Sequence, residues 1–472
     1  MNRATSRTAT LLAIAALALC AGQGVAVGEM PPPVDPLMLP ENGPAAPPQA
    51  TSQRTLCVPA MSGGDGANVP PAQLDLAFDK VWPITTGAGQ RVAVIDTGVS
   101  RHPRLPNLEP GGDYVGAADG TEDCDAHGTV VAGLIGAQPA TGSGFSGAAP
   151  GATIITIRQS SSAYSVAGSR GDPNIAENSS GYGNVDTMAM AVRHAADMGA
   201  TVINISEVAC KPAAEGINDQ RLGAAIQYAA LVKDIVVVAA AGNVGSGGCK
   251  TQNPTPSSLT PHADLWNSIN TLASPAWYDD LVLTVGSVDP NGAASSFSLG
   301  GPWVDVSAPG TGIVSLHPTE SGLTNGTYGP NGSDQAINGT SFAAPYVAAT
   351  AALVRSRYPD LTAAQVVQRI ESTAHAPAEG WNPYIGHGVV DPLAAVTAMP
   401  SDVETYPLGH HTSTVAALPV PPSPDNRARD AALLGVAAVG SLGILALLSS
   451  FPIRRVFAER GHRSRRQETA DT

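Results

Sequence analysis

The stretch Val92-Ala-Val-Ile-Asp-Thr-Gly98 decides the fold class, because four apolar residues run without interruption into a carboxylate and a glycine. Continuous apolar runs of this length are typical of parallel strands that are buried on both faces. Comparable runs follow at 154–157, 202–205, 235–240 and 281–285. Apolar residues at helical spacing occur between and after these runs, at 185–198, 218–233, 342–357 and 363–373. This alternation predicts an α/β domain with a central, mainly parallel sheet.

Ligands of open parallel sheets bind beyond the carboxyl ends of the strands, and Asp96 lies at such an end. His127 opens the segment His-Gly-Thr-Val-Val-Ala-Gly, whose small residues indicate a closely packed helix. Ser341 lies in Asn-Gly-Thr-Ser-Phe-Ala-Ala-Pro, at a predicted loop-to-helix junction. Considered singly, Asp96 is more simply interpreted as a turn residue, His127 as a packed surface histidine and Ser341 as an N-cap. Taken together, they supply an acid, a base and a nucleophile in the chain order Asp, His, Ser.

This chain order, and the absence of Gly-x-Ser-x-Gly around Ser341, argue against an esterase of the α/β-hydrolase type. Residues 94–98, 127–129 and 339–345 resemble, in order, the three signature segments of subtilisin-like serine proteases, and residues 240–243 resemble a fourth. The resemblance implies a subtilisin-like three-layer fold with Asp96, His127 and Ser341 as catalytic triad. It also implies that Asn243 supplies an oxyanion-hole amide. No cofactor is expected, and no metal, since no acidic calcium loop is recognisable.

The resemblance also bears on substrate binding. Residues 202–206 resemble the edge strand along which these proteases bind a peptide by strand addition. After Ser206 the chain continues Glu-Val-Ala-Cys, where many secreted relatives carry Leu-Gly-Gly, so no side-chain preference is transferred. Four further groups near the motifs receive ordinary interpretations. We expect surface positions for His102, Asp123 and Asp125 and a structural role for His194.

Both ends of the chain indicate export and anchoring. Residues 1–28 show the charged, apolar and small-residue regions of a secretory signal peptide. Residues 431–453 are apolar and long enough to span a bilayer, and the arginine-rich tail at 454–472 marks the cytoplasmic flank. Between these ends we expect a Pro-rich extension at 29–73, a protease domain at 74–400 and a Pro-rich linker at 401–430. The net charge of −14 argues against nucleic-acid binding.

Removal of the signal peptide leaves four cysteines, Cys57, Cys124, Cys210 and Cys249. In an oxidising compartment they predict two disulfides, and the sequence itself permits three pairings. A zinc site is the less favoured interpretation, because the chain contains no Cys-x-x-Cys pair.

The whole plan, from signal peptide to basic tail, resembles the mycosins, membrane-anchored subtilases of actinobacterial type VII secretion systems. The resemblance implies a single-pass protein of the cell membrane whose protease domain lies outside the cytoplasm. It implies protein or peptide substrates and association with a membrane secretion complex. The alternative is a mainly structural subunit of that complex. A Cys57–Cys124 bond would tie the extension to the segment before His127, and Cys210 would then pair with Cys249.

Overall fold

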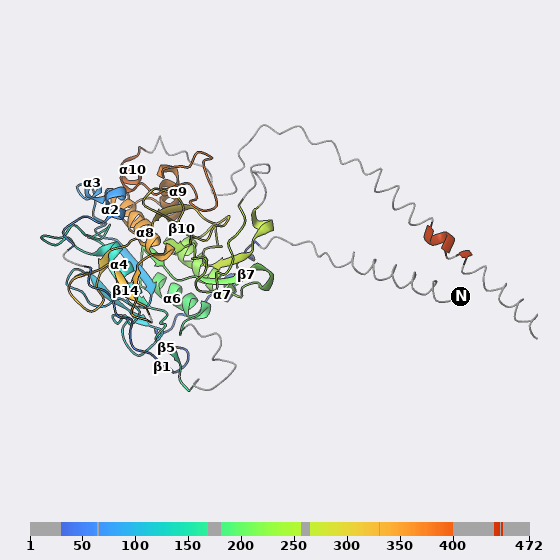
Figure 1. The fold of residues 1–472 in the computed structure, drawn as a ribbon, viewed down its shortest axis with the longest axis horizontal. Coiled ribbons are helices and arrows are strands. Elements are labelled where there is room, and N and C mark those ends of the chain that lie inside the picture. The colour runs from blue at the N-terminus through green and yellow to red at the C-terminus, as the bar shows by residue number, and fades with distance from the viewer. Residues whose placement is uncertain are drawn as a thin grey trace, which may run out of the picture. The chain divides into compact units, whose positions relative to one another are not determined.

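The computed structural model describes residues 30–63, 66–168, 181–255, 265–329, 331–399, 439–443 and 445–446 (Figure 1). One compact unit comprises Met1–Thr405, and in the second, Tyr406–Thr472, only the helical pieces 439–443 and 445–446 are described. The predicted signal peptide, linker and tail lie outside the described residues, as does most of the predicted span at 431–453. No helix of the described part is long and apolar enough to cross a membrane.

A seven-stranded sheet forms the centre of the first unit, and every neighbouring pair of its strands is parallel. In spatial order its strands are β11 (Val306–Pro309), β10 (Leu283–Val288), β8 (Val236–Ala240), β6 (Val202–Ile205), β2 (Arg91–Asp96), β4 (Thr153–Arg158) and β3 (Leu108–Asp113). All five apolar runs found in the sequence lie in this sheet. The predicted α/β class with a mainly parallel sheet is therefore confirmed.

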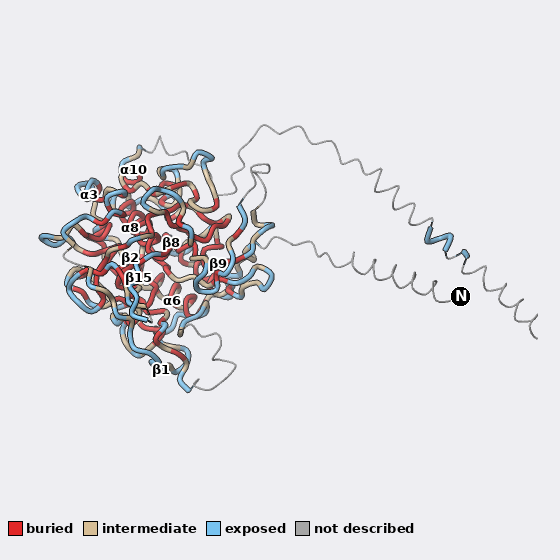
Figure 2. The backbone as a smooth tube through the Cα atoms, viewed as in Figure 1, coloured by how far each residue is buried: buried red, intermediate tan, exposed pale blue. Residues whose placement is uncertain are grey.

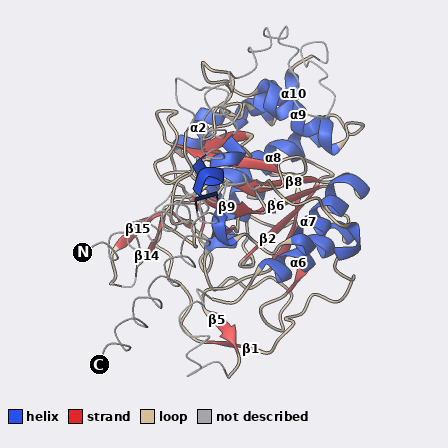
Figure 3. Cartoon of the chain, turned by 90° about the vertical axis from the view of Figure 1, so that its right-hand side faces the viewer, coloured by secondary structure: helices blue, strands red, loops and turns tan. Residues whose placement is uncertain are grey.

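The strand β2 contributes to two apolar cores, one on each face of the sheet. Val92 and Val94 pack with α4 (His127–Gly136) and α8 (Thr340–Arg357), whereas Ala93 and Ile95 pack with α6 (Val185–Asp197) and α7 (Gln220–Gln227). Figure 3 shows β8, β6 and β2 between α8 on one side and α6 and α7 on the other. Buried backbone runs through the centre of the unit in Figure 2. Burial on both faces explains why the strand sequence is apolar at every position.

The other helices are short or peripheral: α2 (Pro71–Leu76), α3 (Phe78–Val81), α9 (Ala363–Thr373), α10 (Pro392–Thr397) and the turns η1 (Pro36–Met38), η2 (Ala213–Glu215), η3 (Tyr228–Val232) and η4 (Leu265–Ser268). The helix predicted at 218–233 forms as α7 and η3. Asp219 is at its N-cap position, but its carboxylate accepts hydrogen bonds from the side chains of Ser274, Trp277 and Tyr278 instead of capping the helix.

The N-terminal extension lies along the domain as an extended arm. Its strand β1 (Thr51–Gln53) pairs antiparallel with β5 (Tyr164–Val166), and Cys57 is bonded to Cys124. The second disulfide joins Cys210 to Cys249, so both bonds have the expected partners. The remaining strands form small antiparallel pairs: β7 (Ala209–Pro212) with β9 (Thr271–Ser274), β12 (Ser315–Leu316) with β13 (Leu323–Thr324), and β14 (Gly326–Tyr328) with β15 (Asp334–Ala336).

The interpretation of residues 202–206 as an edge strand is wrong. Strand β6 lies in the middle of the sheet and pairs with β2 on one side and β8 on the other. Its backbone groups are therefore already used within the sheet, and no peptide can add to it. The continuation after Ile205, where Ser206, Glu207 and Val208 belong to no strand, is available for such pairing.

Candidate active site

Asp96 ends β2, and its buried carboxylate meets the first residue of α4. Oδ1 of Asp96 lies 2.7 Å from Nδ1 of His127 and also accepts the backbone N–H of Thr97 at 2.8 Å. The carboxylate is therefore held from its own strand before it contacts the imidazole. The side chain of His127 remains 24% exposed, so an incoming molecule can reach the ring. In this arrangement a carboxylate fixes the orientation of an imidazole that exchanges protons with a third group.

The first turn of α4 approaches the end of β2 unusually closely. Gly128 donates its backbone N–H to Oγ1 of Thr97 at 2.9 Å. A Cβ at Gly128 would lie 2.1 Å from the carbonyl oxygen of Gly98, a distance that no side chain tolerates. Glycine is thus required directly after His127, and the His-Gly pair in the sequence has a steric cause.

Asp123 lies beneath this turn and is not the solvated carboxylate expected from the sequence. It accepts hydrogen bonds from Oγ1 of Thr97 at 2.9 Å, and from N and Oγ1 of Thr129 at 2.8 and 2.6 Å. Burial raises the pKa of Asp123 to about 6, although the bonds from Thr129 oppose that shift. Through these contacts Asp123 ties the end of β2 to the first turn of α4 and so fixes the position of His127.

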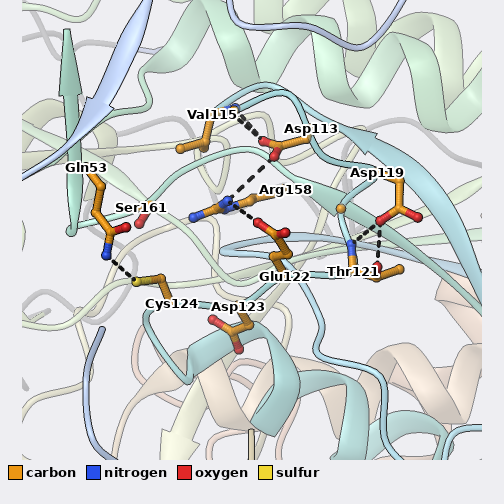
Figure 4. Close-up of polar contacts among 12 residues, drawn as sticks. Gln53, Asp113, Val115, Asp119, Thr121, Glu122, Asp123, Cys124, Arg158 and Ser161 are labelled. Carbon is orange, nitrogen blue, oxygen red and sulfur yellow. Dashed lines mark hydrogen bonds and ion pairs between the residues drawn. The ribbon is translucent and has the colours of Figure 1, made fainter. Parts of the chain in front are cut away.

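Asp125 also has protein partners. It accepts the backbone N–H of Ser162 at 2.8 Å and Oγ of Ser161 at 2.5 Å. Between the two aspartates, Cys124 carries the bond to the arm, and Figure 4 shows Gln53 of the arm reaching its sulfur at 3.6 Å. The segment that delivers His127 is thus held by two carboxylates and one disulfide.

The preceding part of this loop is anchored by Arg158 at the end of β4. Nη1 of Arg158 lies 3.5 Å from Asp113 and 3.7 Å from Glu122, as Figure 4 shows. Arg158 is only 1% exposed, and a buried guanidinium is stable only when it is paired. The loop from Asp113 to Asp125 is therefore fixed at both ends.

Ser341 is the second residue of α8. Its carbonyl oxygen accepts a hydrogen bond from Oγ of Ser206 at 2.8 Å, which ties α8 to the continuation of β6. The next residue, Phe342, lies with its ring centroid 5.0 Å from the ring of His127. The N-terminal turns of α4 and α8 thus meet. The first N–H groups of a helix have no acceptor within it and stabilise nearby negative charge.

Asn243 follows β8 and faces the same helix end. Its Oδ1 accepts the N–H of Thr340 at 2.9 Å and Oγ1 of Thr340 at 3.1 Å. With the oxygen committed to Thr340, the Nδ2 group is the end of the amide that can donate to another oxygen. Four elements, β2, α4, the segment after β8 and α8, therefore bring Asp96, His127, Asn243 and Ser341 together at the carboxyl ends of the central strands.

One ionisable residue at this edge was not predicted. Glu207 follows Ser206, and one carboxylate oxygen each of Glu207 and Asp96 and one ring nitrogen of His127 lie within 4.8 Å of one another. Burial, together with the charge of Asp96, raises the pKa of Glu207 to about 7. A carboxylate directly after the apolar run 202–205 was the available signal, since such strand ends carry ligand-binding groups.

The same carboxylates act on His127. Burial lowers the pKa of this imidazole, but the charges of Asp96, Glu207 and Asp123 outweigh burial and raise it to about 9. By distance, Asp96, His127 and Glu207 form the one group of the described residues that could hold a metal ion. A metal there would occupy the imidazole nitrogen or the carboxylate that the proton-transfer geometry uses.

The two other histidines considered in the sequence analysis lie away from this site. His102 is 6% exposed rather than on the surface, and its Nδ1 accepts the backbone N–H of Arg104 at 3.1 Å. His194 lies within α6, and burial lowers its pKa. Neither residue contacts the candidate active site through any bond found in the described part of the chain.

Known proteins are similar to this chain in sequence and in fold. The profile of the subtilase family matches residues 87–388. Mycosin-4 of Mycobacterium tuberculosis is 51% identical over 461 residues, which cover 94% of this chain and 96% of the relative. Mycosin-1 of the same organism is 44% identical, with 93% and 97% covered. Subtilisin DY of Bacillus licheniformis is 33% identical over 66% of this chain and 91% of its own length.

Solved structures show the same similarity. The MycP3 protease from the type VII (ESX-3) secretion system is 47% identical, with a TM-score of 0.73, over 79% of this chain and 100% of that one. A chain of an intact ESX-5 inner membrane complex is 43% identical, with a TM-score of 0.74, over 89% of this chain and 100% of that one. The family match at 87–388 covers the sheet and all four motifs. This chain belongs to the subtilase family of serine proteases.

Proposed function

We propose that this chain is a serine endopeptidase with Asp96, His127 and Ser341 as its triad. The observation that carries the proposal is the 2.7 Å contact between Asp96 and His127, beside the turn of α8 that bears Ser341. A buried carboxylate, an accessible imidazole and a hydroxyl at a helix N-terminus are the parts that acyl transfer requires.

In the proposed reaction His127 removes the proton from Oγ of Ser341 as that oxygen attacks the scissile carbonyl carbon. Asp96 holds the imidazole and stabilises its cation. Nδ2 of Asn243 and the N–H of Ser341 donate hydrogen bonds to the oxyanion of the tetrahedral intermediate. His127 then protonates the leaving amine, and water hydrolyses the acyl-enzyme by the same steps. No cofactor takes part.

We further propose where the enzyme works. Residues 1–28 direct export, 29–73 form the arm, 74–400 the protease domain and 401–430 a linker to a membrane span at 431–453, with a cytoplasmic tail at 454–472. The protease domain then lies outside the cytoplasmic membrane. Two chains of similar structure belong to an intact ESX-5 inner membrane complex and to the periplasmic assembly of that complex. We extend to this chain a role beside a type VII secretion complex, with exported proteins as substrates.

The experiment compares the full chain, purified in mild detergent, with its Ser341→Ala and His127→Ala variants on an unfolded protein and on a quenched-fluorescent peptide library. Peptide-bond cleavage by the unsubstituted chain alone is expected. Equal cleavage by all three proteins would reveal a contaminating protease, and no cleavage by any of the folded proteins would contradict the proposal.

The second candidate function is a mainly structural subunit of the secretion complex. It is favoured by the relatives found inside assembled complexes. Co-purification of the Ser341→Ala chain with a complex that is lost when the whole chain is deleted would support this role. The two functions are compatible, because peptide cleavage uses the candidate active site and assembly into a complex uses the outer surface of the domain.

A further inference from the structure

The segment after β6 presents Glu207 at a fixed place beside the candidate triad. On one side, Ser206 is tied to the carbonyl of Ser341 at 2.8 Å. On the other, Cys210 is bonded to Cys249, and β7 pairs with β9. Residues 206–208 are therefore held at both ends but belong to no strand, which leaves their backbone available to an extended peptide.

The surroundings of Glu207 are negatively charged. One of its carboxylate oxygens lies within 4.8 Å of a carboxylate oxygen of Asp96 and of a ring nitrogen of His127. The charge of Asp125 also acts on Glu207, and the Ser160 side chain donates a hydrogen bond to it. Among the described residues, no ion pair joins Glu207 to a lysine or arginine. Its cationic neighbour is His127, whose charge lowers the pKa of Glu207 only while the imidazole is protonated. When His127 is neutral, as proton acceptance requires, the shielded carboxylate is unpaired, and a cation that arrives with a ligand removes the cost of that state.

We propose that Glu207 is a specificity-determining residue whose carboxylate binds a lysine or arginine side chain of the substrate, next to His127. The inference rests on the proposed endopeptidase function and names its substrate class, a peptide with a cationic side chain close to the scissile bond. The carboxylate attracts ammonium and guanidinium groups and offers apolar groups no favourable contact.

A purely structural role for Glu207 is the rival explanation, since its carboxylate accepts a hydrogen bond from Ser160. The two roles differ in what a substitution changes. Loss of a structural bond changes the stability of the protein and weakens the binding of all peptides alike. Loss of a specificity contact changes the ratio of affinities between a cationic peptide and a neutral one of the same size.

The test measures binding, so that it remains valid whether or not the chain cleaves peptides. The full chain carrying Ser341→Ala is titrated, in EDTA to remove divalent cations, with fluorescent alanine-rich peptides. Each position in turn carries lysine, norleucine or glutamate. At one position we expect lysine to bind about tenfold more tightly than norleucine, and the advantage to shrink as salt is raised.

Three substitutions added to this chain separate the explanations. Glu207→Gln should bring the lysine-to-norleucine ratio close to one, and Glu207→Lys should shift the preference to glutamate. Glu215→Gln, which removes an exposed carboxylate from the same part of the chain, should leave the ratio unchanged. A ratio near one at every position in the parent chain overturns the inference without any variant. A lysine preference that survives Glu207→Gln also overturns it.

Discussion

The two halves of the candidate active site are held in place by different means. The acid–base half, Asp96 and His127, rests on side-chain hydrogen bonds to Asp123 and on a loop tied to the arm through Cys124. The nucleophile half, Ser341 and Asn243, rests on contacts made largely by the backbone of α8, whose residues are nearly all buried. Each half also has its own disulfide, since Cys249 packs beside Gly242, the residue before Asn243.

This difference indicates where the chain can vary. A half positioned by backbone packing tolerates little change, and its sequence is dominated by small residues. A half positioned by charged side chains is sensitive to pH and to substitutions outside the motifs. We therefore expect substitutions in the nucleophile half to act on the chemical step. Those around the acid–base half should act on orientation, stability and pH dependence.

The largest effect is expected in the nucleophile half. Asn243→Ala should lower kcat by about 10²–10³-fold with little change in KM, because it removes a donor used mainly in the transition state. The same change at the exposed Asn291 should have no effect. Steady-state kinetics on a peptide substrate measure both variants. A loss confined to KM would contradict the assigned role of Asn243.

The disulfides should show the next largest effect. Replacing either cysteine pair by serine should cost about 2–4 kcal/mol of unfolding free energy. Cys57–Cys124 spans 67 residues and Cys210–Cys249 spans 39, so loop entropy makes the first loss greater by about 0.5 kcal/mol. Denaturant unfolding measures this difference. If the Cys57–Cys124 variant were as stable as the parent, the arm would not be holding the approach to His127.

Asp123→Asn should lower kcat/KM by about tenfold, since one amide cannot accept every bond that Thr97 and Thr129 now donate and His127 would shift. Asp125→Asn is the matched control within the same loop, and it should affect activity less because its partners are Ser161 and Ser162. An equal loss in both variants would show that the loop as a whole, rather than Asp123, positions the histidine.

The smallest expected effect is a shift of the pH profile. Protonated His127 cannot accept the proton of Ser341, and its pKa is raised to about 9 by neighbouring carboxylates against the effect of burial. The rate kcat/KM should therefore rise with pH above the ordinary histidine range. Glu207→Gln removes one of these charges, so it should move the rise to lower pH by about one unit. An unchanged rise in Glu207→Gln, alongside an unchanged Glu215→Gln control, would show that Glu207 does not act on His127.

The sequence predicted the centre of the fold better than its margins. All five predicted strands lie inside the sheet, where burial on both faces makes them apolar throughout. The two strands that were not predicted, β3 and β11, are the edges of the sheet. Each contains a proline, Pro110 or Pro309, and β3 also has two glycines, which sequence rules assign to turns. Edge strands tolerate these residues because one side of the strand lacks a full strand partner, and on that side β11 has an isolated bridge from Ser307 to Val389.

The residues of the candidate site also differ in how well the sequence predicts them. Asp96, His127, Asn243 and Ser341 stand in motifs and could be named from the sequence. Asp123 could not, because its burial depends on how α4 packs against the end of β2, and a local pattern does not contain that contact. Glu207 was visible as a departure from related sequences, but its proximity to Asp96 and His127 depends on the order of strands in the sheet.

Covalent labelling of the full chain by a fluorophosphonate, with the modified residue located by peptide mass spectrometry, shows whether Ser341 is an activated nucleophile. Such probes react with a serine that an adjacent imidazole has activated. We expect one label per chain, on Ser341, that is lost in His127→Ala. A label on another residue, or no label on the folded chain, would contradict this expectation.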